Sequence, residues 1–165
     1  MQNTILRLAL VISLMSFVSC SEGRSTSKGI WGYIDRTGKL VIPAQFTEAR
    51  GFSDGLAAVR VKGSWGYIDR TGRLVIAAQF DEARRFTDGL AAVKVKDNWG
   101  YIDRTGKVVI AAQFPEAREF AGGIAAVRIQ DSWGYIDRTG KIIIPAQFPD
   151  GRSFADGVAL VRING

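Results

Sequence analysis

The stretch Trp31-Gly32-Tyr33-Ile34-Asp35-Arg36-Thr37-Gly38 decides the fold, because it occurs four times without a change. The copies span residues 31–38, 65–72, 99–106 and 133–140, and each begins 34 residues after the previous one. A fixed period of this length is typical of repeat architectures, in which each repeat is one small unit that stacks on its neighbours. We therefore divide the chain into repeats at 31–64, 65–98, 99–132 and 133–165.

Each octapeptide predicts a strand followed by a tight turn. Tryptophan, tyrosine and isoleucine within a few residues favour a pleated, half-buried strand. Asp35 suits the first position of a type I turn, and Gly38 suits the left-handed residue that follows it. Residues 40–42 then form a second strand, which we place in the middle of its sheet because it is apolar on both faces.

The second half of each repeat predicts a short irregular segment and a third strand. The Glu-Ala-Arg segment at residues 48–50 is too short for a stable helix, so we expect a turn or a short strand there. After the turn signal Asp54-Gly55, residues 56–62 alternate, with Ala57, Val59 and Val61 facing inward. The fold class is therefore all-β, with about three antiparallel strands in each repeat.

Four such repeats can form an open curved array or close into a propeller-like ring. A repeat of 34 residues is short beside the roughly 40–45 residues of common propeller blades. We therefore predict the open array and keep the ring as the alternative. Neither end repeat carries a polar cap, so an open array leaves strand edges through which copies could oligomerise.

The first thirty residues predict export and attachment. Residues 1–19 have the basic start, short apolar core and small-residue end of a signal peptide. Residues 17–20, Phe-Val-Ser-Cys, resemble the lipobox of bacterial lipoproteins, which implies that Cys20, the one cysteine of the chain, is lipidated. Residues 20–30 would then be a flexible tether from a membrane of the bacterial envelope. A secreted or periplasmic protein cut near Ser19 is the alternative.

The repeat pattern continues beyond the octapeptide with Gly-Lys, Ile-Pro, two phenylalanines and Gly-Leu-Ala. Over residues 28–165 this pattern resembles the bacterial WG repeat family. The resemblance implies an all-β repeat protein, often exported or surface-attached, with an interaction role and without a common enzyme activity. We therefore expect a non-enzymatic interaction scaffold that needs no cofactor and binds a protein or an anionic polymer of the envelope.

Two sets of acidic residues could carry chemistry. The hairpin aspartates could offer oxygen ligands to a cation, or they could pair with a second acidic set as acid and base. The simpler interpretation is that each hairpin aspartate caps its own turn, and no residue marks one copy as catalytic. The chain also has no histidine. A cell-wall hydrolase is therefore the least favoured function, and we expect no metal site. The two sets are Asp35, Asp69, Asp103 and Asp137, and Glu48, Glu82, Glu116 and Asp150.

Two further sets could bind a partner. Trp31, Tyr33 and their repeats could stack on sugars, as in a carbohydrate-binding module, or they could be core residues. The arginines at the turn tips could form a basic strip for phosphate or carboxylate groups, or they could simply keep the surface soluble. The formal net charge of +6 permits an anionic partner, while the export signal argues against nucleic acid. The candidate partner-binding residues are Arg36, Arg70, Arg104 and Arg138.

Overall fold

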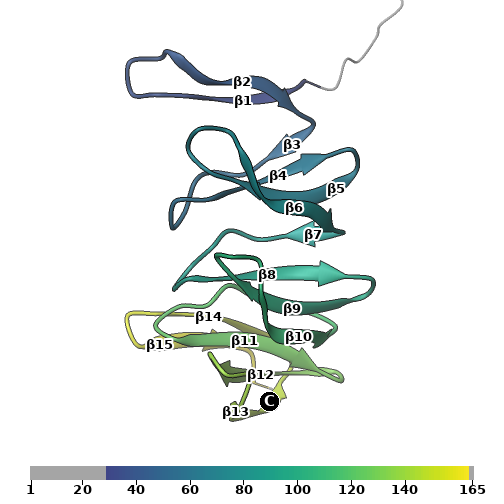
Figure 1. The fold of residues 1–165 in the computed structure, drawn as a ribbon. Coiled ribbons are helices and arrows are strands. Elements are labelled where there is room, and N and C mark those ends of the chain that lie inside the picture. The colour runs from purple at the N-terminus through teal and green to yellow at the C-terminus, as the bar shows by residue number, and fades with distance from the viewer. Residues whose placement is uncertain (1–28, 164–165) are drawn as a thin grey trace, which may run out of the picture.

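The computed structural model describes residues 29–163, where every regular element is a β-strand. The fifteen strands form five small antiparallel sheets, and no sheet closes on itself within this range. The predicted open array is therefore confirmed (Figure 1). The sheets are β1 (Trp31–Ile34) with β2 (Leu40–Phe46); β3 (Glu48–Ala49), β4 (Ala57–Val61), β5 (Ser64–Ile68) and β6 (Leu74–Phe80); β7 (Glu82–Ala83), β8 (Leu90–Val95), β9 (Asn98–Asp103) and β10 (Val108–Phe114); β11 (Ile124–Ile129), β12 (Ser132–Asp137) and β13 (Ile142–Phe148); and β14 (Gly151–Ala155) with β15 (Val158–Val161).

The larger sheets each combine strands from two successive repeats. Strand β4 follows the short strand β3 and is the strand predicted as the third of the first repeat; we keep the name third strand for it and its counterparts. It pairs with β5, the Trp-Gly strand of the second repeat, so that Val59 lies opposite Gly66. The same junction recurs between β8 and β9, and between β11 and β12. Successive repeats are therefore joined by a continuous backbone hydrogen-bond ladder as well as by the chain.

The hydrophobic core lies between successive sheets. One cluster packs Tyr67 and Ile76 of the second sheet against Ala91 and Val93 of the third. On the opposite face of the second sheet, Ile68 packs with residues of the first. The central strands are therefore covered on both faces, which is the situation that favours continuous apolar runs.

Burial on both faces corrects the alternation that we expected in the third strand. Ala57 and Val59 are buried as predicted, but Ala58 between them is buried as well. Small side chains suit this position because a neighbouring sheet lies on each side. At the end of the strand, Arg60 and Val61 are only half-buried.

The prediction for the second strand was wrong. Strands β2, β6, β10 and β13 lie at the edges of their sheets rather than in the middle. In β6, Leu74 and Val75 are exposed while Ile76 is buried, because the register shifts between Tyr67 and Ile68 and leaves Val75 outside the pairing. An apolar run can therefore stand on an edge strand when a bulge turns part of it away from the core.

The same irregular pairing requires glycine as the second residue of each Trp-Gly pair. A Cβ on Gly100 would lie 2.5 Å from the carbonyl oxygen of Ile110 and 2.6 Å from the backbone nitrogen of Ala112. The bulged strand β10 thus crosses β9 at a distance that admits only glycine.

Candidate functional site

The four hairpin tips that carry the candidate arginines have the same internal structure. In the third tip, one oxygen of Asp103 accepts hydrogen bonds from the Thr105 hydroxyl at 2.6 Å, the Thr105 N–H at 2.9 Å and the Lys107 N–H at 3.1 Å. The Thr105 hydroxyl is the largest of the influences that lower the pKa of Asp103 below its usual value. The hairpin aspartates are therefore turn caps, as the simpler interpretation held.

The aspartates do not form a carboxylate array for a cation. In each repeat the capping oxygen is directed back into its own turn, at Asp35, Asp69, Asp103 and Asp137. Within residues 29–163 there is no group of three potential metal-ligating side chains. In the same range we find no helix with the length and hydrophobicity that a membrane crossing requires.

The candidate arginines lie at the tips of these hairpins and are exposed. Among the described residues, none of the four forms an ion pair with a carboxylate. A second basic residue is also exposed three positions further along each hairpin. Each tip therefore presents two cations beside one aspartate whose charge is engaged in the turn. The second set is Lys39, Arg73, Lys107 and Lys141.

The hairpin tips of successive repeats make similar contacts with the repeats that precede them. The backbone at Gly106 lies against Ile76 of the preceding repeat, so that an added Cβ would be 3.1 Å from the Ile76 Cγ2. The Arg104 guanidinium lies over the Asp54-Gly55 turn, with its Nη2 3.2 Å from the position of a Cβ on Gly55. The equivalent contacts recur one repeat further on, at Gly140 and Arg138. We call the row of Arg36, Arg70, Arg104 and Arg138 the basic strip.

The aromatic residues of the octapeptide are mainly structural. Trp65, Trp99 and Trp133 are each 5% exposed. The preceding repeat places an arginine guanidinium over each of these rings, with distances to the ring centroid of 5.0 Å for Arg50, 4.8 Å for Arg84 and 4.6 Å for Arg118. A repeated aromatic platform for sugars is therefore absent from these three copies. Only the first copy differs, since Trp31 is 57% exposed.

Three of the four octapeptide tyrosines, Tyr67, Tyr101 and Tyr135, are buried for the same structural purpose, whereas Tyr33 is half-buried. The Tyr101 hydroxyl donates to the Arg118 carbonyl at 2.8 Å, and its ring packs against Phe120. Burial raises the pKa of Tyr101 well above its ordinary value. This phenol therefore stays neutral and holds the irregular segment after β10 against the core.

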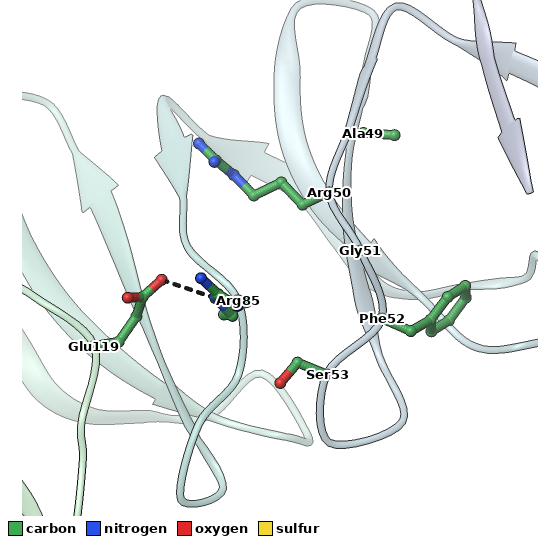
Figure 2. A pocket seen from close by; sticks show the side chains of 7 residues that line it. All are labelled: Ala49, Arg50, Gly51, Phe52, Ser53, Arg85 and Glu119. Atoms are coloured by element: carbon green, nitrogen blue, oxygen red, sulfur yellow. Dashed lines mark hydrogen bonds and ion pairs between the residues drawn. The ribbon is translucent and has the colours of Figure 1, made fainter. Parts of the chain in front are cut away.

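A groove on another part of the surface was missed by the sequence interpretation. It has a volume of about 420 Å³ and is formed by three successive repeats (Figure 2). The groove is crossed by an ion pair between Arg85 and Glu119 at 3.3 Å, which Figure 2 shows beside Ser53. Its lining residues are Ala49, Arg50, Gly51, Phe52, Ser53, Arg85 and Glu119.

The signal for this groove lies in how the repeats differ. The position between the invariant arginine and the invariant phenylalanine is occupied in turn by Gly51, Arg85, Glu119 and Ser153. Most other positions keep their chemical character from one repeat to the next. At this position of the repeat the charge of the side chain changes from copy to copy. The surface that these residues form therefore differs between repeats.

The fold and these contacts define an open all-β repeat protein whose successive units share hydrogen-bond ladders and arginine–tryptophan stacks. The family model for the WG containing repeat matches residues 31–64, 65–99, 99–131 and 133–165. The chain therefore belongs to the WG repeat family. Neither a curated protein nor a solved structure matches it significantly.

Proposed function

We propose that this protein is a non-enzymatic scaffold of the bacterial cell envelope whose basic strip binds an anionic polymer. The observation that carries the proposal is the row of four exposed arginines on identical hairpins, none of which pairs with a carboxylate among residues 29–163. Membership of a repeat family with interaction roles supports the general class of function. The ligand would be a chain of phosphate or carboxylate groups.

The recurrence of one exposed arginine in every repeat makes the strip suited to a polymer rather than to a single small anion. Each guanidinium offers a planar set of donors to phosphate or carboxylate oxygens. One exposed contact of this kind contributes little, but four on a fixed scaffold raise the effective concentration of each further contact. The neighbouring lysine or arginine of each hairpin adds to the local positive potential.

The test compares two double variants of the chain that begins at Ser21. That chain contains every described strand and all of the core clusters. We expect Arg70→Gln/Arg104→Gln to weaken binding of inorganic polyphosphate and polygalacturonate by about tenfold or more, and to reduce the salt dependence of the binding constant. Isothermal titration at several salt concentrations measures both quantities.

The matched control removes the same charge at the other end of the strands. Lys62 and Lys96 lie in the turns that precede β5 and β9, and both have a positive φ. Gln130 occupies the equivalent turn with a φ of 54°, so glutamine is accommodated there. Lys62→Gln/Lys96→Gln should change binding by less than about threefold. Equal losses in the two double variants would show that net charge, not the strip, governs binding.

We further propose that the scaffold is attached to the envelope through lipid on Cys20, which lies outside the described residues. The proposal rests on the signal-like residues 1–19 and on the lipobox resemblance of residues 17–20. In a bacterium that expresses the full chain, the membrane-extracted protein should begin at Cys20 and carry the added mass of acyl chains. Cys20→Ala should move the protein out of the membrane fraction. An intact mass equal to that of unmodified residues 20–165 would contradict this proposal.

A further inference from the structure

The two end sheets each expose one half of a junction that occurs three times inside the chain. At each internal junction a third strand pairs with the following Trp-Gly strand. Strand β1 is a Trp-Gly strand that pairs only with β2, and β15 is a third strand that pairs only with β14. Within residues 29–163, the outer edges of β1 and β15 have no strand partner.

We propose that copies of this chain associate head to tail, with β15 of one copy adding to the outer edge of β1 of the next. The partner is a second copy because the chain already contains this interface, with the same residues in the same register. The proposal does not require the polymer-binding function, although Arg36 and Arg70 of the basic strip also line the groove at the β1 end.

The exposed side chains at the two ends are those that are buried at the internal junctions. Trp31 is 57% exposed, against 5% for Trp65, and Ile34 is 66% exposed, against 1% for Ile68. At the other end, Val158 is 71% exposed, whereas its counterpart Leu56 is 7% exposed. Terminal repeats of a soluble array normally carry polar outer faces, so these apolar ends indicate surfaces that become covered.

The internal register assigns the contacts between two copies. Val59 lies opposite Gly66 and Arg60 lies opposite Trp65 at the first junction. The same register places Val161 of one copy opposite Gly32 of the next, and Arg162 opposite Trp31. Edge-to-edge addition of this kind continues the backbone ladder from one copy to the next.

One end of the array has a tryptophan without a stacked arginine, and the other end has the matching arginine without a tryptophan. Three tryptophans lie under an arginine of the preceding repeat, and Trp31 is the one tryptophan with no such partner among the described residues. Arg152 is the counterpart of those arginines and stacks on no ring of the part of the chain that the structure describes. It lies 3.4 Å from Asp150 and lines a hollow with Leu160 and Val161. In the head-to-tail arrangement Trp31 of the next copy occupies this hollow.

The groove at the β1 end matches the side chains that β15 presents. It has a volume of about 590 Å³, and its apolar wall includes Tyr33, Ile34 and Phe52. At the first internal junction, the corresponding tyrosine and phenylalanine are covered by Leu56 and Ala58. Their counterparts Val158 and Leu160 would cover Tyr33 and Phe52 of the next copy.

The ends depart from the repeat pattern by becoming more apolar. Leu160 stands where the internal repeats have alanine, and Ile30 stands where they have serine or asparagine. The internal pairing of Val61 with Ser64 places Ile163 of one copy opposite Ile30 of the next. Both substitutions thus add apolar area at the proposed interface, and the open groove gives Leu160 room that the internal alanines lack.

The contact is heterologous, because one copy uses β15 and the other uses β1. Such a contact leaves one free end on each copy, so it builds chains of copies unless the curvature closes them into a ring. This property separates the proposal from any symmetric pairing of two β1 edges or two β15 edges, which would stop at a dimer.

The experiment measures the molar mass of the chain that begins at Ser21, by sedimentation over a range of concentrations. Trp31→Glu should block the β1 end, and Leu160→Glu should block the β15 end; each should weaken association by more than about tenfold. Both positions are exposed in the single copy, so the variants should keep the circular dichroism spectrum of the parent chain, and its melting temperature at concentrations low enough for the parent chain to be monomeric. Val109→Glu, at an exposed position midway along the array, is the control and should assemble like the parent chain.

Mixing the two blocked variants gives the sharpest result. Each variant alone should be monomeric, whereas an equimolar mixture should form dimers and nothing larger, because one intact end remains on each copy. A parent chain that stays monomeric at its solubility limit would overturn the proposal. So would a mixture that remains monomeric, or a single variant that still assembles as the parent chain does.

Discussion

Replacing Gly100 by alanine is expected to lower the free energy of unfolding by about 3 kcal/mol. The new Cβ would lie 2.5 Å from the Ile110 carbonyl oxygen and 2.6 Å from the Ala112 nitrogen. Both are backbone atoms of β10, so neither can turn aside as the end of a flexible side chain could. Relief requires β9 and β10 to separate, which would disturb the bulge that sets their register.

Urea denaturation of the chain that begins at Ser21 measures this loss. Gly51→Ala is the matched control, because nothing lies within 4 Å of a Cβ at Gly51 and its φ is not in the left-handed region. That substitution should be neutral or slightly stabilising, since alanine restricts the unfolded chain. If both variants lost the same stability, the close approach at Gly100 would not be the cause.

Replacing Ile76 by alanine is expected to cost about 2–5 kcal/mol of unfolding free energy. Ile76 is 4% exposed, packs in the core between the second and third sheets, and lies beneath the hairpin tip at Gly106. Removing its side chain leaves a cavity that the rigid backbone of the neighbouring tip cannot fill.

The adjacent Val75 supplies the control on the same strand. It is exposed and stands outside the pairing of β5 with β6, so Val75→Ala should change stability by only about 0.5 kcal/mol. Thermal melts of the two variants, recorded in the same buffer, make the comparison. Similar shifts in melting temperature would contradict the orientation of β6 in the structure.

Local features of the repeat could be predicted because their causes lie within a few residues. The aspartate cap of the hairpin follows from the Asp-Arg-Thr-Gly order alone, and the structure places Asp103 and Thr105 in that geometry. The turn also puts Arg104 at an exposed tip, as predicted. The open array followed from the length of the period and is confirmed.

The order of strands in each sheet could not be predicted from the same signals. An apolar run such as residues 74–76 fits a central strand, and only the register shift between Tyr67 and Ile68, which leaves Val75 outside the pairing, shows how part of it is turned away from the core on an edge strand. In the second sheet the central strands are instead β4 and β5; the small alanines of β4 are buried between neighbouring sheets, while Gly66 of β5 allows the close approach of β6 within its own sheet. The apolar pattern therefore identified the strands but not which strands are neighbours, nor that Leu74 and Val75 are exposed.

The candidate site was predictable only where it repeats. The basic strip follows from an invariant turn residue, whereas the groove at Arg85 and Glu119 depends on contacts between three repeats. Pairing between positions 34 residues apart becomes visible only once the stacking is known. Whether the strip binds a partner stays a prediction.

The sharing of each ladder between two successive repeats has a consequence for how such genes change. Because every internal junction uses the same pairing, an in-frame duplication or loss of one 34-residue unit creates no new kind of contact, wherever in the repeat the break falls. Unequal recombination can therefore lengthen or shorten the molecule by whole repeats, and no compensating mutations are needed at the new junction. The number of repeats sets the length of the molecule, and selection can change that number without changing the stability of each repeat.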